Sequence, residues 1–250
     1  MSSPPLPSPS NAIKGVFSTK CLIPVGFGHT KKNTVQNLLV YAVEQENDQI
    51  SVQSLNDRFM PTGASRLITK EELLKNYLPE PDVYFSKVIP VMREVEKGVA
   101  RGERHLQHKE AFSAEMEFKN VLRIDEENIR ATFGLGQCYL SRGDRERGDI
   151  VFRRLVRLKG AFQPCHKHMF NEFGIALRKN KMFAQALKYY ARAMPLCKSD
   201  ENLMFNMSRI FHEKGRDTLA LKFVIKSLEL NPAMPEANQF KLYLEQKLRR

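Results

Sequence analysis

The chain has 250 residues and a net charge of +12, and 42% of its residues are hydrophobic. This apolar content suffices for a folded core, while no apolar run approaches the ~20 residues needed to span a bilayer. The N-terminal sequence has neither a basic start nor an apolar stretch, which argues against a secretory signal. We therefore expect a folded cytoplasmic protein without a membrane span.

The first third of the chain predicts a tail followed by a small β-rich domain. Residues 1–12 are rich in proline and serine and too polar to bury a core, so we expect a disordered tail. Short runs of β-favouring residues then alternate with turn residues. They predict strands at residues 16–19, 21–25, 38–43 and 50–55, of which the last two form a β-hairpin. The β-rich domain is expected to cover residues 13–80.

A glycine-rich basic loop, residues 26–32 (GFGHTKK), lies between two of these strands. Such a loop could hold a phosphate group, but this one lacks the GK[ST] ending and the following helix of a P-loop. The sequence therefore favours a mobile hairpin tip. The role of this loop and of the whole β-rich domain stays open.

Two helix signals follow the predicted strands. Thr69 and Glu72 have the spacing of a capping box, in which each side chain accepts a backbone N–H, and they predict a short helix that ends before Pro79. Pro81 is well placed to open the next helix, because its missing N–H would be unpaired in the first turn. Pro90 should kink or split that helix, so residues 81–94 are expected to form a helical joint.

From residue 95 onward a spacing of small and large residues recurs with a period of 34 residues. The four copies are residues 95–128, 129–162, 167–200 and 201–234. Small residues stand at Gly102, Gly136, Gly174 and Ser208, and again twelve positions later at Ala114, Gly148, Ala186 and Ala220. Large residues follow at Phe118, Phe152, Tyr190 and Val224. This pattern predicts two closely packed antiparallel helices per copy, with the large side chains filling the space between copies.

The pattern resembles that of the tetratricopeptide repeat family over roughly residues 95–250. It departs from the family in having no Trp, in Arg101 where Leu is usual, and in Gly148 where Ala is usual. The resemblance implies a mainly α fold: an α-solenoid of about four helix pairs that share a continuous core. Residues 235–250 are expected to form a capping helix, whose apolar stripe is Ala237, Phe240, Leu244 and Leu248.

The resemblance also implies that the second, fifth, sixth and ninth positions of each first helix line a concave groove. With three residues of the capping helix, these positions give a candidate partner-binding site. It consists of Arg130, Phe133, Gly134, Gln137, His168, Asn171, Glu172, Ile175, Asn202, Phe205, Asn206, Arg209, Gln239, Phe240 and Tyr243.

Two kinds of side chain among these residues suggest how a partner would be held. Asparagine can pair with both polar groups of a peptide backbone, which assigns that role to Asn171 and Asn206. Arginine can bind a carboxylate through two hydrogen bonds, which directs Arg209 toward acidic side chains. The alternative is that Phe133 and Phe205 pack against neighbouring helices while the polar residues only solvate the surface.

One specific ligand of the family is disfavoured. The carboxylate clamp of heat-shock-chaperone adaptors needs Lys and Asn at the fifth and ninth positions, then Asn, then Lys and Arg on successive repeats. This chain has Phe133 and Gln137, then Glu172, then Asn202 and Asn206. The residues of the clamp are therefore absent.

Neither a metal site nor an enzyme is indicated. Cys165, His166 and His168 form a cluster of soft ligands, but zinc needs four ligands and neither Cys138 nor Cys197 has a paired partner. The spacing therefore favours an inter-repeat turn. Cysteines without CxxC spacing suit free thiols in a reducing compartment, and no nucleophile elbow, HExxH or Walker sequence occurs. We expect no cofactor.

These observations predict a non-enzymatic protein–protein interaction scaffold or adaptor that binds a peptide or partner helix in its groove. Residues 81–250 carry +11 of the net charge, which favours a partner of acidic character. The alternative is a basic nucleic-acid-associated protein. Phosphate tracking requires a continuous basic stripe with aromatic platforms, whereas segments such as Arg145-Glu146-Arg147 mix both signs. Neither the partner nor the oligomeric state follows from the sequence.

Overall fold

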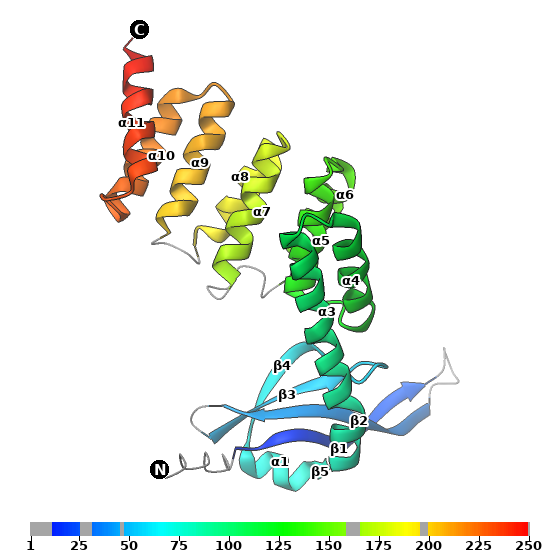
Figure 1. Cartoon of the computed structure of the whole chain (residues 1–250). Helices are drawn as coiled ribbons and strands as arrows, with labels where there is room; N and C mark the ends of the chain where they lie inside the picture. The colour runs from blue at the N-terminus through cyan, green and yellow to red at the C-terminus, as the bar shows by residue number, and fades with distance from the viewer. Residues whose placement is uncertain (1–11, 26–31, 46–47, 159–165, 196–199, 250) are drawn as a thin grey trace, which may run out of the picture. The chain divides into compact units, whose positions relative to one another are not determined.

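The computed structural model describes residues 12–25, 32–45, 48–158, 166–195 and 200–249 (Figure 1). The chain divides into two compact units, Met1–Lys97 and Gly98–Arg250. The first contains a β-sheet and short helices, and the second is helical. The predicted tail, most of the glycine-rich loop, and Cys165 and Cys197 lie outside the described residues. No helix in the described ranges combines the length and the apolar character that crossing a membrane requires.

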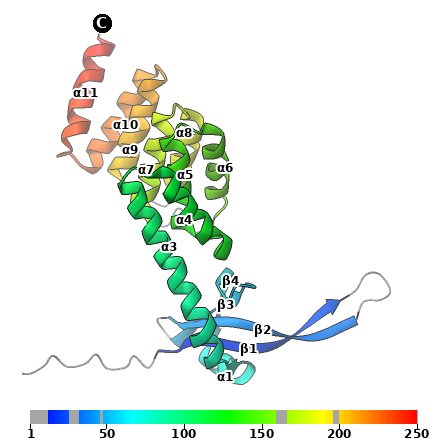
Figure 2. The same ribbon diagram turned by 45° about the vertical axis from the view of Figure 1, so that its right-hand side comes forward.

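The first unit is built on a five-stranded antiparallel sheet with the order β4-β3-β2-β1-β5. Its strands are β1 (Lys14–Val25), β2 (Lys32–Glu44), β3 (Gln49–Leu55), β4 (Pro61–Thr69) and β5 (Leu78–Pro79). Figure 2 shows β1 and β2 extending together beyond the other strands.

Two strand predictions need correction. Residues 16–19 and 21–25 belong to one strand, because Lys20 continues the ladder opposite Asn37 and no turn residue interrupts it. Strand β4 was not predicted, because it lies at the sheet edge and exposes most of its side chains. Among its nine residues only Ile68 is buried, so it lacks the apolar alternation that marks a half-buried strand.

Both faces of the sheet are covered by helical residues of the same unit. Alternate residues of a strand point to opposite faces: Val40 packs with Leu73 of helix α1 (Lys70–Asn76). Tyr41 packs instead with Val88. Half of the predicted capping box is present, since the Thr69 hydroxyl accepts the Glu72 N–H at 3.1 Å. In place of the predicted bond back to the Thr69 N–H, the Glu72 carboxylate binds Arg66 at 2.6 Å.

The helical segment after the sheet passes Pro90 without ending there. It comprises α2 (Pro81–Val83), the π-helical turn η3 (Tyr84–Val88) and α3 (Ile89–Gln107), and Pro81 opens it as expected. A proline ring clashes with the carbonyl four residues earlier in a regular helix. The wider π turn directly before Ile89 accommodates Pro90, so the predicted splitting of the helix does not occur.

The second unit continues with α4 (Ala111–Ile124), α5 (Ile129–Ser141), α6 (Arg145–Leu155), α7 (Lys167–Lys179), α8 (Phe183–Ala193), α9 (Glu201–Glu213), α10 (Asp217–Leu230) and α11 (Pro235–Leu248). Successive helices from α4 to α6 and from α7 to α11 pack side by side, and α7 also contacts both α5 and α9 (Figure 1). This is the stacked arrangement of helix pairs in a solenoid.

Glycines allow the helices to approach closely around aromatic rings. The Phe118 ring lies so near to α3 and α5 that a Cβ atom added at Gly102 or Gly134 would come within 2.6 or 2.2 Å of it. A Cβ atom at Gly174 would likewise lie 2.3 Å from Tyr190. These contacts explain why small residues recur at the predicted positions.

An aromatic cluster fills the centre of the second unit. Tyr189 is fully buried, and its ring centroid lies 5.5–6.5 Å from the rings of five neighbours. The neighbours are Phe133, Phe152, Phe170, Phe173 and Tyr190. Because they come from α5, α6, α7 and α8, this cluster joins two successive helix pairs.

A buried ion pair makes the stability of this unit depend on pH. Glu115 is 8% exposed, and its carboxylate binds Lys119 at 2.6 Å and also Arg142. Burial raises the pKa of Glu115, but the hydrogen bonds and charges of Lys119 and Arg142 outweigh burial and lower that pKa to about 2. The pKa in the unfolded chain is about 4.3, so this stabilisation is complete above that pH and is lost as the pH falls toward 2.

We expect Glu115→Gln to lower the free energy of unfolding by about 1–3 kcal/mol at neutral pH. The loss is smaller than for a fully buried pair because Arg142 keeps 18% of its side chain exposed. Urea denaturation at pH 7 and about pH 3 tests this, since the difference from the wild type should shrink at the lower pH. A difference that is equal at both pH values would contradict the assignment.

Helix α11 covers the last helix pair. Ala237 and Leu244 are fully buried against Ala220 and Val224 of α10, and Phe240 packs at the edge of this cluster. Leu248 does not complete the predicted stripe, because it is 42% exposed at the end of the helix.

Removing α11 by truncation before Pro235 should lower the melting temperature and promote self-association. Burying a side chain of the size of Leu244 is worth about 1.5–3 kcal/mol, and the truncation would expose the apolar residues of α10. Thermal denaturation and size-exclusion chromatography check both effects. A monomeric truncation with an unchanged melting temperature would show that α11 contributes nothing to the core.

Candidate functional site

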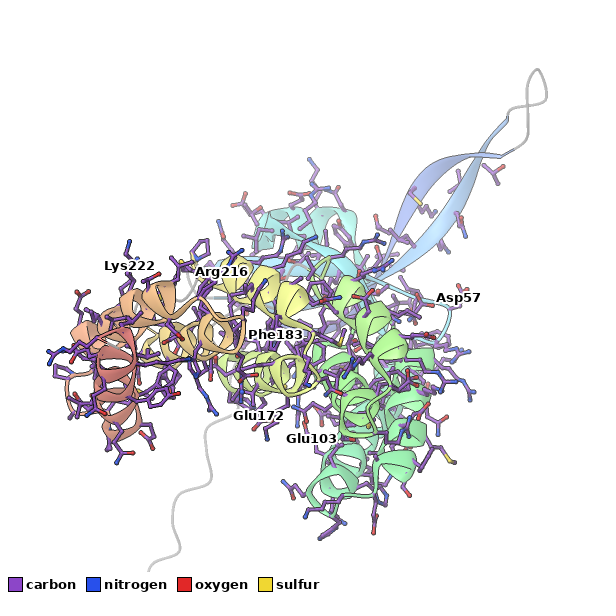
Figure 3. All side chains as sticks on the ribbon, turned by 90° about the horizontal axis from the view of Figure 1, so that it is seen from above. Asp57, Glu103, Glu172, Phe183, Arg216 and Lys222 are labelled. Atoms are coloured by element: carbon purple, nitrogen blue, oxygen red, sulfur yellow. The ribbon has the colours of Figure 1, made fainter. Side chains whose placement is uncertain are left out.

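Most of the residues predicted to line a groove lie around three hollows of the second unit, with volumes of about 490, 550 and 540 Å³. The walls come mainly from α5, α7, α9 and α11, which are the helices that the sequence assigned to the concave face. Figure 3 shows Glu103 and Glu172 on the same side of this unit, away from Lys222 and Arg216.

The first hollow lies between α9 and α11, and we call it the aromatic hollow. Its lining residues are Phe205, Arg209, His212, Glu213, Glu236, Gln239, Phe240 and Tyr243. The Phe240 ring stands perpendicular to Phe205 at a centroid distance of 6.0 Å and stacks with Tyr243 at 6.2 Å. Rings from two helices thus form the apolar walls.

Arg209 brings a positive charge into the aromatic hollow. Its guanidinium lies 5.8 Å from the centroid of the Phe205 ring, within the range of a cation–π contact. Partial burial and the nearby charge of Arg178 lower the pKa of Arg209. Arg178 itself is buried and binds the carboxylate of Glu213. The surroundings of Arg209 therefore leave room for an additional anion.

His212 closes the aromatic hollow and is itself held in place. Its Nδ1 atom lies 2.5 Å from a carboxylate oxygen of Asp217, and its ring meets Phe240 and Tyr243 edge to face at 5.4 Å. Lys247 binds the other oxygen of Asp217 at 2.9 Å. Hydrogen bonds from His212 and then Lys247 lower the pKa of Asp217, so this carboxylate ties α9, α10 and α11 together.

The second hollow, which we call the central hollow, lies between α3, α5 and α7. The guanidinium of Arg130 makes two hydrogen bonds, of 3.0 and 2.6 Å, to the carboxylate of Glu103. The amide of Gln137 donates to Glu172 at 3.0 Å. His168 also lies in the lining. Most of the charged groups here already have partners, so the central hollow offers polar contacts rather than a free charge.

The third hollow adjoins the central hollow and shares Gln137 and Glu172 with it. Ile175 adds an apolar side chain, and Lys179 adds a positive charge at its edge. The central and third hollows therefore form one continuous stretch along α5 and α7.

Four of the predicted groove residues take other roles. Phe133 is 1% exposed and packs in the aromatic cluster, because α5 is buried along most of its length. It borders the central hollow but cannot act as an exposed anchor. Asn206 is 6% exposed on the packed side of α9. Asn171 donates to Asp200 at 3.3 Å, and Asn202 donates to Glu201. Burial leaves Asn206 little surface for a partner, whereas Asn171 is half-buried and uses its amide N–H toward Asp200. That Asn171 and Asn206 hold a peptide backbone stays a prediction.

Several lining residues were missed, among them Glu103, Leu106, His212 and Glu213. A signal for them exists in the sequence. His212 and Glu213 are the twelfth and thirteenth positions of a helix that begins at Glu201, three and four residues beyond Arg209. Residues at that spacing share one helix face, so extending the same stripe by one turn would have found them.

Within the described part of the chain, no group of three or more histidine, cysteine or acidic side chains could hold a metal ion. The predicted turn at Cys165 and His166 cannot be followed further, because Cys165 is outside the described residues. Cys138 is fully buried on α5, and burial raises the pKa of its thiol to about 12, so this cysteine acts as an apolar core residue.

No family model matches the sequence. One similar protein is anaphase-promoting complex subunit 3 of Schizosaccharomyces pombe, which is 27% identical over 101 residues. The match covers 40% of this chain and 14% of that protein, so the chain spans only a small part of its relative.

Solved structures resemble a larger share of the chain. PilF of Pseudomonas aeruginosa superimposes with a TM-score of 0.54 at 18% identity, covering 64% of this chain and 71% of that one. The MamA protein of Desulfovibrio magneticus RS-1, from its residue 41 to the end, gives 0.51 at 16% identity, covering 62% and 86%. At such low identities the likeness shows the fold alone.

Proposed function

Because the helical part of this chain has the fold of the tetratricopeptide repeat family, we propose that the protein is a non-enzymatic interaction scaffold. It binds a peptide or partner helix along the face formed by α5, α7, α9 and α11. The observation that carries this proposal is the row of hollows along these helices, each lined by both apolar and polar side chains. Mixed walls of this kind suit binding rather than reaction, because the polar groups orient a ligand and the apolar groups hold it.

The proposal includes a count of four repeats, residues 95–128, 129–162, 167–200 and 201–234, followed by a cap at residues 235–250. Helices α5, α7 and α9 begin at Ile129, Lys167 and Glu201, which are the first residues of the last three repeats. The β-rich domain of residues 13–80 and the joint of residues 81–94 complete this organisation. We place the protein in the cytoplasm, because cysteines without CxxC spacing suit a reducing compartment.

The partner in this proposal is a protein segment of acidic character. Arg209 and Lys179 are cations of the lining, and neither has an ion-pair partner among the described residues. Other cations of the second unit are engaged: Arg130 with Glu103, Arg142 with Glu115, and Arg153 with Asp149. The helices also mix charges of both signs, as in Arg145-Glu146-Arg147, whereas phosphate tracking requires a continuous basic stripe with aromatic platforms. We therefore do not propose nucleic acid as the partner.

A comparison of two charge reversals tests the proposal. The partner is first recovered by affinity capture with the full chain, and its binding is then measured for Arg209→Glu and Lys222→Glu across a salt series. Arg209→Glu should weaken binding about thirtyfold or more, because it leaves a partner carboxylate unpaired. Lys222→Glu, an exposed change on α10 (Figure 3), should have little effect. Equal losses with a steep salt dependence would instead indicate nucleic acid.

A further inference from the structure

The aromatic hollow has the dimensions and walls of a site for one large apolar side chain. Its volume of about 490 Å³ falls within the range of small-ligand sites. Phe240 is only half-buried and Tyr243 is 49% exposed, so parts of both rings remain open to an incoming group. Aromatic rings attract apolar and aromatic groups through area burial and through edge-to-face contacts.

A single cation beside these rings selects the charge of the occupant. The carboxylate of Glu213, the lining acid nearest to Arg209 in the chain, is bound by Arg178. No carboxylate of the described residues forms an ion pair with Arg209, whose guanidinium therefore keeps N–H donors for a ligand. Glu236 also belongs to the lining, but it is exposed in the first turn of α11, where water and salt screen its charge.

We propose that the aromatic hollow binds an extended peptide segment in which a large apolar or aromatic side chain lies next to a carboxylate. The apolar side chain enters between Phe205, Phe240 and Tyr243. The carboxylate accepts two hydrogen bonds from Arg209, the geometry that guanidinium and carboxylate groups favour. This inference rests on the proposed function and specifies which part of the concave face selects the partner by its side chains.

A cationic occupant is the chemical alternative for a hollow with aromatic walls, because such rings attract ammonium groups. The position of Arg209 argues against it. Its guanidinium already occupies the neighbourhood of the Phe205 ring, and a second cation there would meet like-charge repulsion in a partly desolvated site. Burial and the charge of Arg178 lower the pKa of Arg209 by more than the nearby Glu213 and Tyr190 raise it. A further anion would therefore stabilise the guanidinium, and a cation would destabilise it.

Selection of random short peptides displayed on phage against the full chain tests this inference. The selected peptides should contain Phe, Tyr, Trp or Leu within two positions of Asp or Glu. In fluorescence anisotropy with a labelled selected peptide, Arg209→Gln should weaken binding about thirtyfold or more. Replacing the peptide carboxylate by its amide should cause a similar loss with the wild type and little further loss with Arg209→Gln, which is the signature of a direct pair.

Two further variants separate this inference from the proposed function. Tyr243→Ala alters a half-exposed wall of the aromatic hollow and should weaken binding, whereas Lys222→Gln should not. Peptides that are weakened by Gln137→Ala in the central hollow but not by Arg209→Gln would overturn this inference and leave the proposed function standing. Selected peptides with Lys or Arg beside the aromatic residue would overturn it as well, and so would a selection that yields no binding peptide.

Discussion

Tyr189→Ala should destabilise the helical unit by about 3–5 kcal/mol, the cost of removing a large buried aromatic side chain. Tyr189 is fully buried, with a relative exposure of 0%, and its ring contacts five other aromatic rings. The cavity would open between two helix pairs that stabilise each other, so the loss should not remain local. Urea denaturation followed by circular dichroism, to which the helices contribute most of the signal, measures the change.

The matched control is Tyr189→Phe, which keeps the ring in the cluster. It should change the free energy of unfolding by only about 1 kcal/mol, the size of one hydrogen-bonding group. A loss for Tyr189→Ala no greater than that for Tyr189→Phe would show that the aromatic cluster does not hold the helix pairs together.

Gly134→Ala should lower the free energy of unfolding by about 1–3 kcal/mol, although alanine is the better helix former. A Cβ atom at this position would lie 2.2 Å from the Phe118 ring. Phe118 is fully buried, and its ring also packs closely against Gly102, so it has little room to move. The cost of overpacking a core therefore outweighs the gain in helix propensity of about 1 kcal/mol.

Gly148→Ala is the control for helix propensity, since it makes the same chemical change in α6. The added Cβ atom would meet the Cδ2 atom of Leu140 at 2.6 Å. Leu140 is buried, but Cδ2 is the end of a flexible side chain and needs a smaller movement than the rigid ring of Phe118. Gly148→Ala should therefore be neutral or stabilising by up to about 1 kcal/mol. If Gly134→Ala were as well tolerated as Gly148→Ala, the close packing of Phe118 between α3 and α5 would be disproved.

The spacing of small and large residues carried most of the information about the helical fold. A close helix–helix contact leaves no room for a Cβ atom, as at Gly102 and Gly174, so these positions must be small and the pattern must recur. The sequence of β4 carries no such constraint, because an edge strand with exposed side chains has little to bury. The role of Tyr189 also could not be read from the repeat pattern, which marks its neighbour Tyr190.

The candidate site was predictable as a face but not residue by residue. The positions implied by the family resemblance, together with the capping helix, included Phe205, Arg209, Phe240 and Tyr243, which meet in the aromatic hollow. The same positions included Phe133 and Asn206, which the structure buries. Whether a residue at the edge of a helix face points into the groove or into the core depends on how closely the next helix packs, and one repeat alone does not encode that distance.

Hydrogen exchange on the full chain with and without its captured partner tests most directly whether the concave face is the binding surface. The partner should slow amide exchange along α5, α7, α9 and α11, with the strongest effect around Arg209 and Tyr243. Helices α4, α6, α8 and α10 should change little. Protection confined to these four helices, or to the β-sheet of the first unit, would show that the concave face is not the binding surface.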